Sequence, residues 1–167
     1  MTIAQTLLPE LDQEMAGTRR MLAVVPAADA DWRPHPRSFS LGELASHIAL
    51  LPLWGRITLE HPELDLGGPG AAEIPRPRFT TVPALLAEFD RNVQEARAAL
   101  AATPDSAMEA VWTLRNAGRT VFSLPRAAVM RGFVLSHMIY HRGQLSVYLR
   151  LRDVPLPPLY GPTADSR

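Results

Sequence analysis

Four stretches with apolar side chains at helical spacing constrain the fold of this 167-residue chain more than any other feature. Apolar residues recur every three or four positions across residues 3–25, 41–61, 82–103 and 124–151. This period places them on one face of a helix, which must be buried against another element. Four such helices predict an all-α fold, a four-helix bundle, in a single domain spanning residues 1–167.

Capping residues and a proline indicate where these helices begin. Ser40, with Glu43 three residues later, has the form of a capping box at the start of the second helix. Thr81 and Ser123 are the expected caps of the third and last helices. Pro9 indicates that the first helix begins or bends near this position, because proline cannot donate a backbone hydrogen bond.

The connections between the predicted helices are long. Residues 61–80 contain several glycines and prolines without periodicity, which predicts an irregular connection that crosses the bundle or covers a site. Residues 108–123 partly alternate around a turn at Asn116-Ala117-Gly118, which predicts a small β-hairpin or an extended loop. A bundle with an up-down-up-down order and short loops is therefore not required.

Composition excludes several kinds of chemistry. Lys+Arg and Asp+Glu balance at 17 each, so no strong field favours nucleic acid or an acidic membrane surface as a partner. The chain contains no Lys and no Cys, which excludes a Schiff base, a disulfide, a thiolate ligand and a cysteine nucleophile. Because neither a leader nor an apolar run of membrane-spanning length is present, we expect a cytoplasmic protein.

Two histidines on the last predicted helix are the strongest candidates for a functional site. His137 and His141 are four residues apart, so their side chains share a helical face with Cβ atoms about 5–6 Å apart. They fall on the apolar stripe that carries Met130, Val134 and Leu145. Two imidazoles so placed can bind one metal ion. The alternative is a pair of buried histidines with hydrogen-bond partners in the core.

A third ligand has to come from another helix. His47, near the start of the second predicted helix, is the only other histidine in an inner helical region. Facing helices assemble the metal sites of bundles, and three neutral imidazoles leave at least one coordination position open, as in reactive sites. His35 and His61 lie in proline-flanked connections and are poorer candidates.

Several sequence segments resemble one known family. The last helix contains the phrase His-x-x-x-His-Arg-Gly-Gln-Leu, preceded by a distant helical histidine. With its neighbours, this phrase is similar to the DinB-like (YfiT-like) family of metal-dependent proteins, which is unrelated to the DNA polymerase of the same name. The likeness covers about residues 22–162, is weakest in residues 61–110, and rests on residues 32–34, 38–47, 136–145, 148–150 and 155–162.

The resemblance implies a four-helix bundle, commonly a homodimer, with a divalent metal ion held by three histidines. These correspond here to His47, His137 and His141. Some members are thiol transferases or isomerases that use low-molecular-weight thiols. This chain shows no extra domain of the kind that thiol-dependent isomerases can carry, which makes a specific isomerase role less favoured. Zinc and nickel suit imidazole ligands best, and iron and manganese are the other candidates.

Two classes of function stay open. The first is a metal-dependent enzyme acting on a small molecule, either a hydrolase that uses bound water or a transferase that uses a thiol from solution. The second is a noncatalytic metal-binding or ligand-binding protein of a stress-response type.

Three side chains near the histidines have expected supporting roles. Gln144 and Glu43 are candidate hydrogen-bond partners of the imidazole rings, although Glu43 is explained more simply by the capping box. Arg142 is expected to point away from the histidines. It would then pair with a carboxylate or lie at a dimer contact, where Gly143 lets another helix approach.

Overall fold

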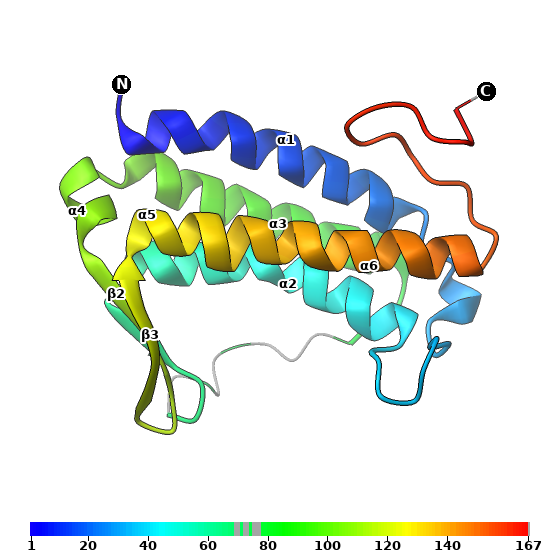
Figure 1. Cartoon of the computed structure of the whole chain (residues 1–167), viewed down its shortest axis with the longest axis horizontal. Helices are drawn as coiled ribbons and strands as arrows, with labels where there is room; N and C mark the ends of the chain where they lie inside the picture. Colours follow the sequence, from blue (N-terminus) through cyan, green and yellow to red (C-terminus); the bar gives the residue numbers. More distant parts are fainter. Residues whose placement is uncertain (69–70, 72–73, 75–77, 167) are drawn as a thin grey trace.

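A computed structural model describes residues 1–68, 71, 74 and 78–166 (Figure 1). Its longer helices and its strands, in chain order, are α1 (Ile3–Ala23), α2 (Leu41–Glu60), β1 (Glu63–Asp65), α3 (Val82–Ala102), β2 (Val111–Asn116), β3 (Arg119–Pro125) and α6 (His137–Leu151). The shorter helical segments are η1 (Ala27–Asp29), α4 (Asp105–Glu109), α5 (Arg126–Val129) and the π-helical η3 (Met130–Ser136).

The four long helical elements form the predicted bundle. Helices α1 and α2 each contact both α3 and α6, so the cyclic order around the bundle is α1, α3, α2, α6. Figure 1 shows that α2 ends and α3 begins at opposite ends of the bundle, so these neighbours run in the same direction. This topology explains the length of the connection over residues 61–80, part of which lies outside the described residues. The prediction of a helical bundle with long connections is confirmed.

The core fills the space between these helices with the apolar faces that the sequence pattern indicates. Burying each of its larger side chains contributes about 1.5–3 kcal/mol of hydrophobic stabilisation. Its almost fully buried members, drawn from all four long helical elements, include Leu11, Leu22, Leu44, Ile48, Phe89, Leu100, Met138 and Leu145.

The helix starts agree with the predicted caps in two cases. Ser40 Oγ accepts a hydrogen bond from the Glu43 amide, and Glu43 Oε2 accepts one from the Ser40 amide at 2.6 Å, which completes the capping box of α2. Thr81 caps α3. Helix α1, by contrast, begins at Ile3 after a capping box of its own and runs through Pro9, so a start near Pro9 is wrong.

Of the two structures predicted for residues 108–123, a hairpin or an extended loop, the hairpin is present, and it is part of a three-stranded sheet. Strands β2 and β3 are antiparallel, and β1 pairs with β2 in parallel, with Glu63 opposite Thr113. Strand β1 falls within the connection predicted to be irregular. The Asp65 carboxylate fixes it by accepting hydrogen bonds from the amides of Gly67 (3.0 Å) and Gly118 (2.8 Å), contacts that no local pattern reveals.

The last helix differs from its prediction in two ways. Ser123 is not its cap: it lies in β3 opposite Thr113, and their hydroxyl oxygens are 2.9 Å apart. The helix begins instead at Arg126, because Pro125 ends the strand. It is also not one regular α-helix, since residues Met130–Ser136 are π-helical. Such wider turns occur mostly as single interruptions of α-helices and frequently adjoin functional sites.

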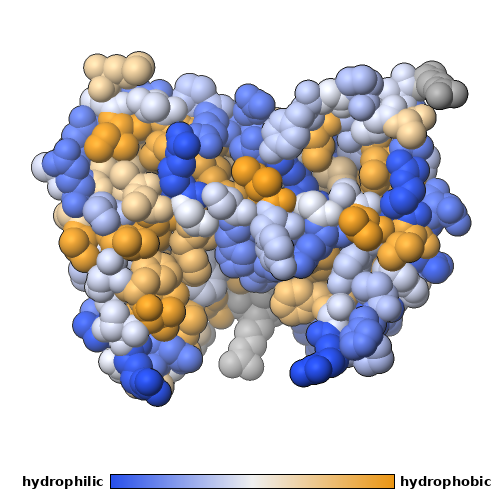
Figure 2. Space-filling model, viewed as in Figure 1, coloured by the Kyte–Doolittle hydropathy of each residue, from blue (hydrophilic) through white to orange (hydrophobic). Residues whose placement is uncertain are grey.

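No helix in the described part of the chain is both long and apolar enough to cross a membrane. On the face shown in Figure 2, hydrophobic residues gather at several places and are interspersed with hydrophilic ones. Exposed apolar side chains of the molecule include Val121 on β3 and Val147 and Leu151 on α6.

Candidate metal centre

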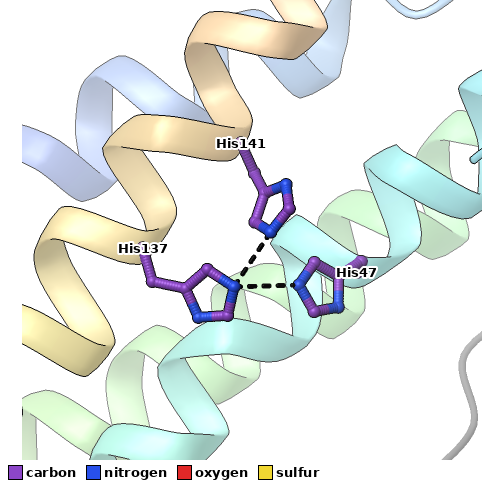
Figure 3. Close-up of side chains that lie close together, drawn as sticks. All are labelled: His47, His137 and His141. Carbon is purple, nitrogen blue, oxygen red and sulfur yellow. Dashed lines mark hydrogen bonds between the residues drawn. The ribbon is translucent and has the colours of Figure 1, made fainter. Parts of the chain in front are cut away.

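Helices α2 and α6 bring the three predicted histidines together inside the bundle. His47 lies in the second turn of α2, whose start is fixed by the Ser40 capping box. His137 is the first residue of α6, directly after the π-helical segment, and His141 follows one turn later. Figure 3 shows the rings of His137 and His141 pointing from one helix toward the ring of His47 on the other.

The three rings face one another through their Nε2 atoms. His137 Nε2 lies 2.9 Å from His141 Nε2 and 3.4 Å from His47 Nε2 (Figure 3). One ligand nitrogen from each ring lies within 4.8 Å of the other two, and this is the one such group of His, Asp and Glu found among the described residues. Neither His35 nor His61 belongs to it, in agreement with the ranking made from the sequence.

Burial keeps these histidines neutral. Burial, together with the smaller effects of the neighbouring rings of His141 and His137, lowers the pKa of His47 to about 4. Burial also lowers the pKa values of His137 and His141. The Phe133 carbonyl opposes this effect at His137, as Gln144 does at His141. Neutral imidazoles retain the lone pair that a metal ion requires.

A hydrogen bond at the far side of His141 fixes which nitrogen carries its proton. Gln144 Oε1 lies 2.7 Å from His141 Nδ1. Because an amide oxygen can only accept a hydrogen bond, the proton of the neutral His141 ring is on Nδ1. A neutral ring then has its lone pair on Nε2, directed into the cluster. This is the arrangement in which a metal-binding histidine donates its other N–H to an oxygen, and the predicted role of Gln144 next to an imidazole is borne out by this contact.

The donor set and its spacing fit a divalent ion. Metal–nitrogen bonds of 2.0–2.1 Å in a tetrahedral site separate ligand nitrogens by roughly 3.3–3.4 Å. The separations of 2.9 and 3.4 Å from His137 to the other two histidines are close to this value, and the third pair, His47 and His141, lies within 4.8 Å. Hydrogen bonds between the rings do not explain the cluster well. A neutral imidazole carries one N–H, so a ring that donates from its outer nitrogen can only accept at Nε2.

Aromatic side chains surround the cluster. The Phe39 ring centroid lies 5.6 Å from that of His47 and 6.3 Å from that of His141. Phe133 lies 5.7 Å from His137. His141 is 9% exposed, and the other two histidines are half-buried, so the cluster is screened from solvent without being sealed.

The other two predicted neighbours have structural roles. Glu43 is occupied by the capping box and lies 3.5 Å from Arg33, so it is not a partner of the imidazole rings. Arg142 points away from the histidines, as expected, and pairs with the buried carboxylate of Glu14 on α1 at 2.6 Å. Being 2% exposed, Arg142 is not available for a dimer contact.

Arg142 has further partners that its sequence neighbourhood does not indicate. Its guanidinium also donates to the Thr18 hydroxyl at 3.1 Å and to the Tyr160 hydroxyl. Tyr160 in turn donates to Glu14 at 2.7 Å, which fastens the C-terminal tail to α1 and α6. Burial raises the pKa of Tyr160, and its hydrogen bond to Glu14 adds to this effect. No periodic signal marks Glu14 or Tyr160 as members of such a network.

The fold and this cluster define a class of protein: a helical bundle in which histidines from two facing helices converge on one point. A sequence model of the DinB superfamily matches residues 10–145, so the chain belongs to the DinB superfamily. No curated protein matches it.

Solved structures of DinB-like proteins share the fold. A DinB-like protein from Bacillus cereus has a TM-score of 0.66 at 19% identity, with 93% of this chain and 97% of that chain covered. The DinB-like protein YjoA from Bacillus subtilis has a TM-score of 0.68 at 17% identity, covering 93% and 96%. A candidate member of the DinB family from Exiguobacterium sibiricum has a TM-score of 0.65 at 19% identity, covering 100% and 99%.

Proposed function

We propose that this protein is a metal-dependent enzyme that acts on a small molecule through a divalent ion held by His47, His137 and His141. The observation that supports this most is the convergence of three Nε2 atoms whose rings are kept neutral by burial. Zinc and nickel suit three imidazole ligands best, while iron and manganese are the alternatives. Three protein ligands leave a position for water or substrate.

The residues around the cluster would prepare the site for chemistry. A bound divalent ion supplies Lewis acidity, which lowers the pKa of water or of a thiol. Gln144 holds the His141 ring in one tautomer and orientation. Phe39 and Phe133 reduce the access of bulk water to the histidines, and a drier surrounding strengthens electrostatic interactions.

The reaction would be either hydrolysis by activated water or the transfer of a thiol to an electrophile. In the second case the thiol has to come from solution, because the chain contains no Cys. The two reactions need the same ion and differ in the nucleophile. The competing proposal is a noncatalytic metal-binding or ligand-binding protein, which would have a fourth protein ligand and no exchangeable water.

A screen of the reconstituted protein tests this proposal. Metal-free protein is loaded with zinc or nickel and assayed with activated esters and amides, and with a low-molecular-weight thiol plus an electrophile. We expect turnover that requires the metal, is lost in His141→Ala and persists in His61→Ala. Bound metal without turnover in any assay, together with a fourth protein ligand in a metal-loaded crystal structure, would favour the noncatalytic alternative.

We also propose that the single domain of residues 1–167 forms a homodimer through helical faces. The outer face of α6 supports this. A Cβ added at Gly143 would meet nothing within 4 Å, and Val147 and Leu151 on that face are 57% and 55% exposed. Sedimentation at micromolar concentration should give the mass of two chains, and Val147→Arg should give the mass of one. A wild-type monomer under these conditions would contradict the proposal.

A further inference from the structure

Two phenylalanine rings flank the histidine cluster from different parts of the fold. Phe39 belongs to the connection before α2 and contacts the rings of His47 and His141. Phe133 belongs to the π-helical segment η3 and contacts the ring of His137. Every histidine of the cluster is therefore next to at least one of the two rings.

Phe39 is exposed, although its backbone is held in place. The residue is 47% exposed, whereas the core residue Phe89 is 1% exposed. The Phe39 carbonyl accepts a hydrogen bond from the Tyr148 hydroxyl at 3.3 Å, and the next residue, Ser40, is fixed by the capping box. A ring on a fixed backbone that already lies against two histidine rings has less conformational entropy to lose when a ligand covers it, and its apolar surface is stabilised by leaving water.

Phe133 extends the aromatic surface away from the cluster. Its ring centroid lies 5.5 Å from that of Trp54 on α2 and 5.4 Å from that of Phe122 on β3, both in edge-to-face arrangements. Phe122 in turn lies 6.0 Å from the fully buried Trp112. The contacts with Trp54 and Phe122 hold the Phe133 ring beside His137.

We propose that Phe39 and Phe133 determine substrate specificity by selecting molecules with an aromatic or flat unsaturated group next to the atoms that bind the ion. Aromatic rings prefer offset or edge-on contact with other aromatic rings, which a methyl group or a short alkyl chain cannot reproduce. This inference rests on the proposed function, since the position of the ion sets where the substrate is anchored.

Hydroxamic acids test the inference without a turnover assay. Protein loaded with Co²⁺ is titrated with benzohydroxamic acid or acetohydroxamic acid, and the visible cobalt spectrum reports binding. The two probes share the metal-binding group and differ in carrying a phenyl or a methyl group. We expect benzohydroxamic acid to bind about tenfold more tightly than acetohydroxamic acid. The phenyl group adds the binding free energy of an aromatic contact and of the apolar surface that it buries.

Variants assign this preference to the two rings. Phe39→Ala, at an exposed position, should bring the two dissociation constants within about twofold of each other, while Phe39→Trp keeps the preference. Phe133→Leu, which keeps an apolar side chain, should reduce it. Val121→Ala removes an exposed apolar side chain on β3 and should change nothing.

The outcomes separate this inference from the proposed function. If both probes bind the wild-type protein equally, or if Phe39→Ala and Phe133→Leu retain the full preference, the specificity role is wrong and the metal site is unaffected. If neither probe changes the cobalt spectrum, the open coordination position is absent, and the proposed function fails together with this inference.

Discussion

Gln144 and His141 lie one helical turn apart on α6, with Gln144 Oε1 2.7 Å from His141 Nδ1. The contact directs the other nitrogen, Nε2, toward His137 and His47. Because partners of this kind orient a ligand and raise its basicity, their loss typically lowers metal affinity by about 10–100-fold.

Gln144→Leu should therefore weaken metal binding by at least about tenfold while the fold is retained. A competition titration of zinc against a chromophoric chelator measures the change, and circular dichroism checks the fold. Gln94→Leu, on the exposed surface of α3, is the matched control and should bind zinc like the wild type. Unchanged affinity in Gln144→Leu would mean that this hydrogen bond does not support the ligand.

The lowered pKa values of the histidines give the metal-free protein a defined pH dependence. The pKa of His47 is about 4 in the folded protein, against 6.5 for an ordinary histidine. Between these values the unfolded chain binds more protons than the folded one, so the free energy of unfolding falls as the pH drops from 6.5 toward 4. Urea denaturation across this range should show the decline, and His47→Asn should make it less steep. An equal slope in both proteins would contradict the assignment.

Metal binding should persist to a lower pH than the ordinary pKa of histidine predicts. From the sequence, proton competition is expected near pH 6.5, the ordinary histidine value. Burial lowers the pKa of all three rings, so competition for the folded protein begins below 6.5. Zinc affinity measured from pH 7.5 to 4.5 should stay nearly level above 6.5 and then decline. A decline that begins above pH 7 would contradict this expectation.

The buried pair of Arg142 and Glu14 should matter to stability far more than the surface ion pairs. Their side chains are 3% and 9% exposed, so Glu14→Leu leaves an uncompensated charge in the interior. We expect a loss of about 3–5 kcal/mol in the free energy of unfolding, and a partial recovery in the double variant Glu14→Leu/Arg142→Met. Urea denaturation measures both.

The exposed pair of Arg97 and Asp12 supplies the control for this experiment. The Arg97 Nε and Asp12 Oδ1 atoms are 2.8 Å apart, comparable with the buried pair, but the two side chains are 50% and 44% exposed. Arg97→Ala should therefore destabilise much less than Glu14→Leu, because water screens the attraction. Similar losses in the two variants would show that burial does not set the contribution of the Arg142 pair.

Strand β1 depends on a close backbone contact at Gly67. A Cβ at this position would lie 2.6 Å from the Ala117 nitrogen and 2.8 Å from its Cα, and backbone atoms cannot move aside cheaply. Gly67→Ala should loosen the pairing of β1 with β2 and leave the bundle intact, which hydrogen exchange of the Leu66 amide would detect. Gly68→Ala, whose nearest neighbour is the Asp65 side chain at 3.0 Å, should have a smaller effect.

The sequence predicts those parts of this fold that are marked by a regular spacing of residues close together in the chain. The apolar period of 3.6 residues locates four helices, and the pair Ser40 and Glu43 locates the start of α2 to the residue. Four-residue spacing also places His137 and His141 on one face, and the inner position of His47 on α2 made it the predicted third member of the cluster.

Features that depend on contacts distant in the chain could not be predicted. Strand β1 is only three residues long and is held by Asp65 reaching Gly118, 53 residues away. No local pattern indicates that Glu14 is buried, because its partner Arg142 lies 128 residues further along. The π-helical segment before His137 has no sequence period of its own that would separate it from an α-helix.

The central claim is that His47, His137 and His141 hold one divalent ion. Elemental analysis of the purified protein after loading with zinc and removal of excess metal tests it most directly, in the wild type, His141→Ala and His61→Ala. We predict about one ion per chain in the wild type and His61→Ala, and far less than one in His141→Ala, since two imidazoles make a weak site. A stoichiometric ion retained in His141→Ala, or none in the wild type, would contradict the account.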